Sequence, residues 1–365
     1  MHSDLLLALV VATALGFDFT NGFHDTATAV ASSISTGAMS PRNAVAVAAV
    51  LNFAGAFISL KVAATIATGI VDAAKVTETI AFAGLVGAIA WNLITWAYGL
   101  PSSSSHALIG GIVGAMLASS SSGVKFGGLL DKVILPGVIA PLAAFAVAGA
   151  AIVMIYRLVA RRRPGAVRRS FRFGQVISGS LLAISHGTND AQKTMGVIAL
   201  ALVAHGDVSA DHFHVPAWVV ISAASAIGLG TYAGGWRIIR TVGSRIIKMD
   251  VAQGFAAQGA GAAVILLSSR FGYPLSTTHV ISGGVVGAGA AKRLSAVRWG
   301  IAGNIALAWA LTLPGAALVA ACAYWLADLF GAGVLGPVLL AILTVGVLGA
   351  LIAGRRARVT EPAST

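Results

Sequence analysis

Two aspartates occupy matching positions within apolar stretches of the chain. Asp25 closes the sequence TNGFHD and Asp190 closes SHGTND, so each follows a glycine, Gly22 or Gly187, by three residues. A carboxylate in an apolar environment is costly unless something compensates its charge, and its oxygens suit a cation or a proton. We therefore predict that both aspartates bind a coupling ion. The glycines are expected to loosen each helix so that backbone groups face the ligand.

Two hydroxyl-rich motifs are also paired. The sequences PSSSSH, beginning at Pro101, and PLSTTH, beginning at Pro274, both read proline, one residue, three hydroxyl side chains and histidine. Proline favours a helix start, and a helix N-terminus offers amide donors and a dipole that attract an anion. The hydroxyls could instead bond their own or a neighbouring helix, but their duplication favours binding of a tetrahedral anion such as phosphate or sulfate. The predicted ligands are Ser103, Ser104, Ser105, Ser276, Thr277 and Thr278.

Other polar side chains near these motifs are interpreted as accessory groups. His106 and His279 end the hydroxyl motifs, where each could carry a proton, orient a hydroxyl or pack. Lys193 follows Asp190 by three residues, so it could pair with that aspartate or reach the anion. Asp18, Asn21 and His24 are weaker candidates.

The elements that carry these motifs are predicted to be membrane helices. Of the 365 residues, 57% are hydrophobic and only 10% are charged, which is too few charges for the surface of a soluble domain. Apolar runs recur at about the 20 residues that a helix needs to cross a bilayer. The first run lacks a preceding positive charge, so we read it as a span and not as a signal peptide. The single cysteine, Cys322, excludes an internal disulfide and is predicted to pack in the core.

The basic residues predict the orientation. Seven arginines lie between Arg157 and Arg172, and the net charge is +12. Basic loops stay in the cytoplasm, which explains the charge without nucleic-acid binding and places the N-terminus outside and the C-terminus inside a cell membrane. The other basic groups assigned to the cytoplasm are Arg42, then Arg237, Arg240, Arg245 and Lys248, then Lys292, Arg293 and Arg298, and finally Arg355, Arg356 and Arg358.

The paired motifs come in the same order in each half, which predicts an internal duplication. The matching spans would run in opposite directions, as in secondary transporters that bind substrate at a repeat interface. We therefore predict an all-α polytopic membrane protein with about 11–12 transmembrane or re-entrant helices in two inverted-topology repeats. A homodimer is left open. The predicted runs are 5–36, 43–67, 79–99, 103–121, 133–157, 174–204, 215–236, 251–270, 276–291, 299–326 and 333–353. The predicted divisions are an N-terminal repeat (1–156), a basic cytoplasmic linker (157–173), a C-terminal repeat (174–353) and a cytoplasmic tail (354–365).

The chain resembles the PiT family of inorganic phosphate transporters, and most closely its bacterial low-affinity members. The resemblance implies import of inorganic phosphate across a lipid bilayer by alternating access, with a co-transported cation and no bound cofactor. Relatives are thought to move metal–phosphate complexes as well. By motif position, it assigns binding to Asp25, Asn189, Asp190 and the hydroxyl runs, with both aspartates as ligands of sodium or metal. The matching stretches are NGFHDTATAVA (21–31), WNLITWAYGLPSSSSHALIG (91–110), SHGTNDAQKTMGVI (185–198) and GYPLSTTHVISGG (272–284).

Three departures from the family pattern bear on the coupling ion. Thr28 stands where the family usually has Asn, so it is a weak candidate ligand. Asn52 and Gln258 stand where sodium-coupled relatives carry Glu, which removes two potential sodium ligands. The sequence therefore favours proton coupling over sodium coupling and keeps both as accessory positions.

Three other functions use some of the same residues or the same scaffold. A sulfate permease would use the same scaffold, but sulfate carries no proton at neutral pH. An intramembrane hydrolase would use Ser105, His106 and Asp190, but adjacent residues point to different faces of a helix. A passive anion channel is not distinguished by motifs, because only accumulation against a gradient separates it from a transporter.

Overall fold

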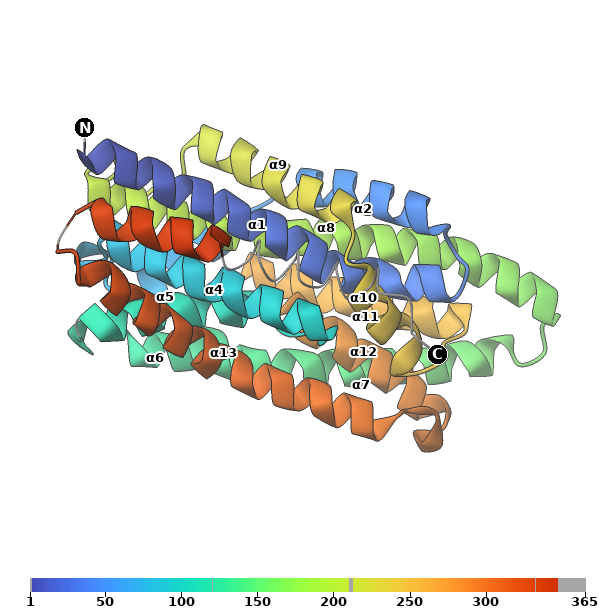
Figure 1. The fold of residues 1–365 in the computed structure, drawn as a ribbon. Coiled ribbons are helices and arrows are strands. Elements are labelled where there is room, and N and C mark those ends of the chain that lie inside the picture. The colour runs from blue at the N-terminus through green and yellow to red at the C-terminus, as the bar shows by residue number, and fades with distance from the viewer. Residues whose placement is uncertain (1, 120, 210–212, 332, 347–365) are drawn as a thin grey trace, which may run out of the picture.

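The computed structural model describes residues 2–119, 121–209, 213–331 and 333–346, which form a bundle of helices with roughly aligned axes (Figure 1). The regular structure in these residues is helical, apart from one isolated bridge between Val71 and Val124. The all-α prediction is therefore confirmed. The main elements are α1 (His2–Ser35), α2 (Pro41–Gly55), α3 (Lys61–Ala64), η1 (Thr65–Gly69), α4 (Glu78–Tyr98), α5 (Ser104–Ser119), α6 (Phe126–Leu129), η4 (Leu130–Ile134), α7 (Leu135–Val159), α8 (Pro164–His205), α9 (Ala217–Ala233), α10 (Trp236–Arg240), η5 (Thr241–Arg245), α11 (Val251–Arg270), α12 (Thr277–Lys292) and α13 (Trp299–Asp328).

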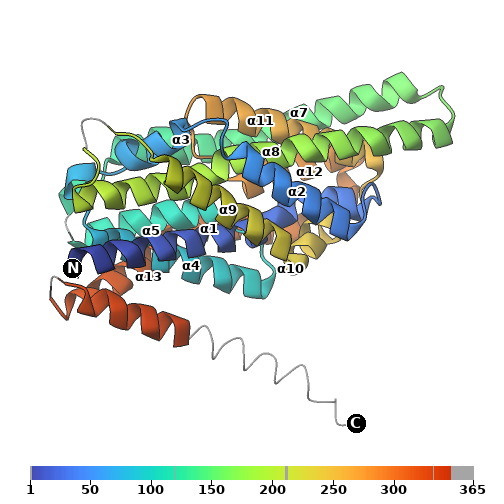
Figure 2. The ribbon, with the colours of Figure 1, turned by 90° about the horizontal axis from the view of Figure 1, so that it is seen from above.

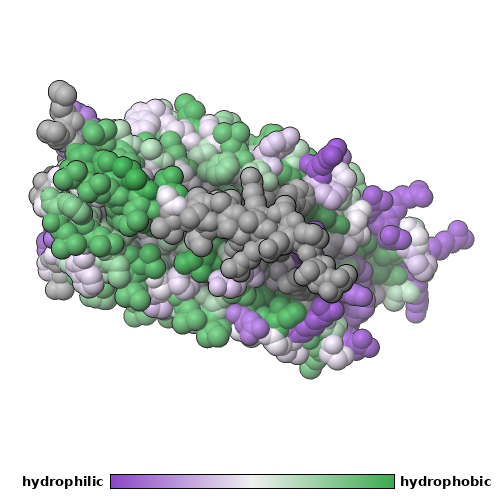
Figure 3. All heavy atoms as spheres, in the orientation of Figure 1, coloured by the Kyte–Doolittle hydropathy of each residue, from purple (hydrophilic) through white to green (hydrophobic). Residues whose placement is uncertain are grey.

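The exterior of the bundle suits lipid. Within the part of the chain that the structure describes, five helical stretches are long and apolar enough to cross a membrane: Asp4–Ser35, Glu78–Tyr98, Phe126–Val159, Val251–Arg270 and Trp299–Asp328. Hydrophobic residues cover much of the visible side, while hydrophilic residues gather at one end (Figure 3). We call this the basic end, because the loop between α7 and α8 and its exposed arginines lie there, beyond the other helices (Figure 2).

The prediction that Cys322 packs in the core was wrong, because its side chain is exposed on α13. Outward positions of a membrane helix are apolar as well, so an apolar neighbourhood does not predict burial. The predicted tail at 354–365 and its arginines lie outside the described residues, as does the end of the predicted span 333–353. The side chains of Arg237 and Arg245 are also outside the description.

Two helical hairpins enter the bundle from opposite ends. In hairpin 1, the start of α4 lies near the end of α5. Just beyond these ends, Lys75 Nζ donates to Ser122 O over 3.3 Å. In hairpin 2, the start of α11 and the end of α12 lie near the basic end. There Lys292 Nζ lies 3.1 Å from Asp250 Oδ2. Four of the predicted crossings are thus two hairpins, an arrangement that the sequence left open.

The tips of the two hairpins have the same design and meet inside the bundle. Gly99 ends α4 and Gly272 follows α11, both with positive φ (66° and 79°), two residues before the motif prolines. Glycine suits this left-handed conformation because it has no Cβ. Ser105 Oγ of tip 1 donates to Leu275 O of tip 2 over 3.0 Å. The tips are defined here as residues 99–105 and 271–278.

The helices that carry the aspartates are continuous, which corrects the expectation that glycine would loosen them. α1 and α8 keep helical structure through Gly22 and Gly187. Instead, these glycines allow close packing: a Cβ on Gly187 would lie 2.0 Å from Asn52 O of α2, and one on Gly22 would lie 2.5 Å from Ile227 O of α9. The breaks lie elsewhere, at 56–60 within the predicted span 43–67 and at 234–235 near the end of the predicted span 215–236.

The glycine contacts are matched in the two halves of the chain. Cβ atoms on Gly110 and Gly114 of α5 would lie 2.4 and 2.1 Å from carbonyls of α13, on Leu313 and Ala317. Cβ atoms on Gly283 and Gly287 of α12 would lie 2.3 and 2.2 Å from carbonyls of α7, on Pro141 and Phe145. Each hairpin thus packs tightly on the last long helix of the other half, through glycines at equivalent positions of the two motifs.

Candidate functional site

Asp25 is the point at which α1 meets both hairpin tips. Its side chain is buried and accepts hydrogen bonds from Ser104 Oγ of tip 1 and from Thr278 Oγ1 of tip 2, the latter over 3.1 Å. His24 Nδ1 lies 2.7 Å from Asp25 Oδ1, and Ser104 also donates to Asn21 Oδ1 over 2.8 Å. Two motifs about 80 and 250 residues away in sequence therefore converge on one carboxylate.

Asp190 forms a similar centre on α8. Thr277 Oγ1 of tip 2 donates to Asp190 Oδ2 over 3.2 Å, and Lys193 Nζ lies 2.5 Å from Asp190 Oδ1. Lys193 also donates to Ser105 Oγ over 2.5 Å and to Leu275 O over 2.8 Å. The buried lysine thus pairs with Asp190, which is one of the two roles that the sequence left open, and it also contacts both tips.

The first residues of α5 and α12 present donors at this centre. Ser103 Oγ accepts from His106 N and Ser276 Oγ accepts from His279 N, so both serines cap their helices. The amides of Ser104 and Thr277 belong to the first turn, which has no intrahelical acceptors. Hydroxyl and amide donors from two helix N-termini can surround an oxyanion here.

His186 also lies at this centre, and it was not among the residues that the sequence predicted for the site. Asn52 Nδ2 donates to Thr231 Oγ1 over 2.7 Å, which leaves its Oδ1 at 3.1 Å from His186 Nδ1. A proton on Nδ1 leaves a lone pair on Nε2, which lies 3.2 Å from Asp190 Oδ2. That contact is favourable only when a proton or a cation lies between the two atoms. The signal in the sequence was the four-residue spacing from His186 to Asp190, which puts both on one helix face.

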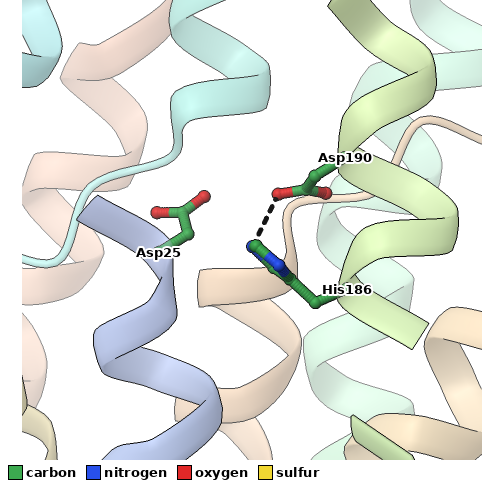
Figure 4. A group of neighbouring side chains, drawn as sticks. All are labelled: Asp25, His186 and Asp190. Carbon is green, nitrogen blue, oxygen red and sulfur yellow. Dashed lines mark ion pairs between the residues drawn. The ribbon is translucent and has the colours of Figure 1, made fainter. Parts of the chain in front are cut away.

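Asp25, His186 and Asp190 could hold a cation together. Figure 4 shows Asp25 on α1 facing the His186–Asp190 pair on α8. One ligand atom from each lies within 4.8 Å of the others, and all three side chains are buried. Two carboxylates and an imidazole are a suitable ligand set for a divalent metal.

Several predicted residues support the site from outside it. Asn189 Nδ2 donates to Ser269 Oγ (2.8 Å) and Tyr273 O (3.1 Å), which ties hairpin 2 to α8. Gln258 Nε2 donates to Ala29 O (3.0 Å) and Ser33 Oγ (2.9 Å), which ties α11 to α1. Neither amide nitrogen contacts the two aspartates.

The two motif histidines and Thr28 also do not contact the aspartates' carboxylates. The rings of His106 and His279 lie 4.8 Å apart, and His279 stacks on Trp309 of α13 at 4.1 Å. Thr28 Oγ1 donates to the backbone oxygen of Asp25 over 2.5 Å. Ser105 bonds Lys193 and Leu275 in place of His106, so the Ser–His pair of a hydrolase is not formed.

Comparisons with known proteins give matches over most of the chain. The model of the phosphate transporter family matches residues 21–166 and 160–320. The chain is 54% identical to a probable low-affinity inorganic phosphate transporter of Mycobacterium tuberculosis, over 89% of this chain and 78% of that protein. It is 49% identical to one of Rhizobium meliloti and 44% identical to one of Bacillus subtilis, each over 89% of this chain and at least 97% of the relative.

A solved structure shares the fold. It is described as the sodium-dependent phosphate transporter, with a TM-score of 0.81 and 24% sequence identity over 89% of this chain and 99% of that one. The family match covers both hairpin tips and both aspartates. The chain therefore belongs to the phosphate transporter family, a family of membrane transporters and not of enzymes.

Proposed function

We propose that this transporter imports inorganic phosphate with a cation by alternating access, and that phosphate binds between the two hairpin tips. The observation that carries the proposal is the convergence of both tips on the two aspartates. Asp25 contacts Ser104 and Thr278, one from each tip. Lys193 contacts Ser105 and Leu275, again one from each tip. A ligand that accepts hydrogen bonds from hydroxyls of both tips would hold the tips together.

The charge of the site supports cation coupling. Asp25 and Asp190 bring two negative charges and Lys193 brings one positive charge, all buried. Phosphate adds at least one more negative charge. Unbalanced charge in a low-dielectric interior costs several kcal/mol per ion, so phosphate needs an accompanying cation or proton.

For the accompanying ion we favour the proton, and we include a divalent metal as cargo. The neutral side chains of Asn52 and Gln258 support the proton, because both amides are occupied by hydrogen bonds to neighbouring helices. The cluster of Asp25, His186 and Asp190 suits a metal that enters as a complex with phosphate. Sodium coupling is the alternative, with the two aspartates as ligands.

The architecture supports alternating access through two inverted repeats. The two hairpins open toward opposite ends of the bundle, and their glycines pack on matched helices of the other half. A structure of this kind can open either hairpin in turn while the aspartates stay in place. With the arginines of the α7–α8 loop in the cytoplasm, hairpin 1 faces outside and hairpin 2 faces inside.

Labelled phosphate uptake into proteoliposomes tests the proposal. The lumen is buffered at one pH and the external solution is made more acidic. Parallel samples contain either choline or sodium in the external solution, each with and without Mg²⁺. We expect accumulation above the outside concentration without sodium, and no competition by equimolar sulfate. Uptake that requires sodium and ignores the pH gradient would replace the proton with sodium. Absence of uptake under every gradient would refute phosphate as the substrate, and uptake blocked by equimolar sulfate would refute selectivity for phosphate over sulfate.

A further inference from the structure

A third buried carboxylate lies outside the hydrogen-bond network of the two central aspartates. Asp18, on α1, has no exposed surface. No described residue hydrogen-bonds either of its carboxylate oxygens. Asp25 and Asp190, in contrast, each receive hydrogen bonds from hydroxyls of the tips. The three acidic groups therefore have different chemistry: two are stabilised as anions, and Asp18 is not.

The nearby positive charge is already committed. Lys193 and Asp190 of α8 are the charged groups near enough to act on Asp18. An ammonium group has three donors, and Lys193 directs hydrogen bonds to Asp190, Ser105 and Leu275. None of these goes to Asp18, while the negative charge of Asp190 opposes a second anion beside it.

The other helices that pack chiefly on α1 supply no compensating charge at this level. The ionisable side chains of α4 are Glu78 and Tyr98, at its two ends, and that of α9 is Tyr232. Tyr98 and Tyr232 are exposed, and Glu78 is held by His205.

The surroundings of Asp18 are polar but incompletely bonded. Thr194 and Asn21 lie beside the carboxylate, and neither Thr194 Oγ1 nor Asn21 Nδ2 has a hydrogen-bond partner among the described residues. A buried carboxylate to which no hydrogen bond is formed is more stable with a proton than without one. These neighbours can exchange hydrogen bonds with a protonated acid.

We propose that Asp18 is a proton-carrying carboxyl group of the transport cycle, distinct from the aspartates that face phosphate. This inference rests on the proposed phosphate import. Asp18 stays protonated while Lys193 is hydrogen-bonded to both tips. When a tip moves away, Lys193 loses Ser105 or Leu275 and its freed donor can stabilise the Asp18 carboxylate, which then releases its proton to water. Opening of the site and proton release are thereby linked through one lysine.

The test compares wild type with Asp18→Asn, which has the shape of the protonated acid but cannot release a proton. Both are reconstituted with a luminal pH dye, and protons and labelled phosphate entering are counted in one experiment. Phosphate–phosphate exchange at equal pH is measured in parallel. We expect Asp18→Asn to keep exchange within about twofold of wild type and to carry about one proton fewer per phosphate. Asp131→Asn, which alters an exposed acid, is the matched control. It should keep the wild-type exchange rate and the wild-type number of protons per phosphate.

The outcomes separate the inference from the proposed function. An unchanged proton count in Asp18→Asn overturns the inference and leaves phosphate import standing. Loss of exchange together with proton movement also overturns it, since Asp18 would then serve phosphate binding. Sodium-dependent uptake that loses its sodium dependence in Asp18→Asn would place a sodium ion there instead. If Asp18→Asn does not fold, Asp18→Thr is measured in the same way. A wild type that does not exchange phosphate refutes the proposed function itself.

Discussion

Removal of the buried Lys193 charge has a predictable cost. In Lys193→Met, Asp190 loses its 2.5 Å ion pair and becomes an uncompensated anion with no exposed surface. Breaking a buried pair by removing one partner typically costs about 3–5 kcal/mol. With an unfolding entropy of about 2.1 cal/mol/K per residue, this lowers the melting temperature of a chain of this length by roughly 4–7 °C. Ser105 and Leu275 also lose a donor, so the tips should separate more easily.

The double variant Lys193→Met/Asp190→Asn is the control that isolates the charge. Replacing a whole buried ion pair by neutral groups is often close to neutral in stability, so the double variant should recover most of the loss. The melting temperatures of wild type, Lys193→Met, Asp190→Asn and the double variant, all purified in one detergent, form a double-mutant cycle. A single variant that melts like wild type, or a double variant no more stable than the single, would refute the charge argument.

Three further predictions concern Gly187, His186 and His205. Gly187→Ala should impair expression or lower the melting temperature, because its Cβ would lie 2.0 Å from Asn52 O; Gly165→Ala, in open space, is the control, and equal stability of the two would contradict the packing argument. His186→Phe should lower Mg²⁺–phosphate uptake at least tenfold more than metal-free phosphate uptake, since it removes a ligand of the proposed metal; an equal loss of both would remove His186 from metal binding. The hydrogen bond with Glu78 raises the pKa of His205, just beyond the predicted span 174–204. This contact should therefore stabilise the protein fully below pH of about 6.5 and lose its effect as pH rises through the raised pKa. The melting-temperature difference between wild type and His205→Gln, followed against pH, should shrink in that direction, and a difference that grows would contradict it.

The membrane class and the chemical motifs were readable from the sequence because each has a local signature. Apolar runs and few charges predicted membrane helices, and proline followed by hydroxyls predicted the helix starts that form the tips. The prolines at Pro101 and Pro274 do precede α5 and α12. Which runs cross and which turn back was not readable, because a re-entrant helix is as apolar as a crossing one.

Contacts between distant segments were the part that the sequence could not supply. Asn52 was singled out because it stands where sodium-coupled relatives carry Glu, whereas the structure shows that its side chain contacts His186 from a different helix. His106 and His279 end the two duplicated motifs, yet their rings contact each other at a tilt and the ring of His279 stacks on Trp309. A helix places neighbouring side chains on different faces, so His106 and His279, which follow Ser105 and Thr278, are directed away from the two central aspartates.

Transport by neutral variants of the two central aspartates tests the account most directly. Asp25→Asn and Asp190→Asn keep the shape of each side chain but remove the charge that the cation must balance. Uptake of labelled phosphate into proteoliposomes under an inward proton gradient is measured for both, with Asp131→Asn as the exposed control. The account predicts loss of uptake in both central variants, with folded, monodisperse protein and normal uptake in the control. Near wild-type uptake by either central variant would remove that aspartate from the mechanism.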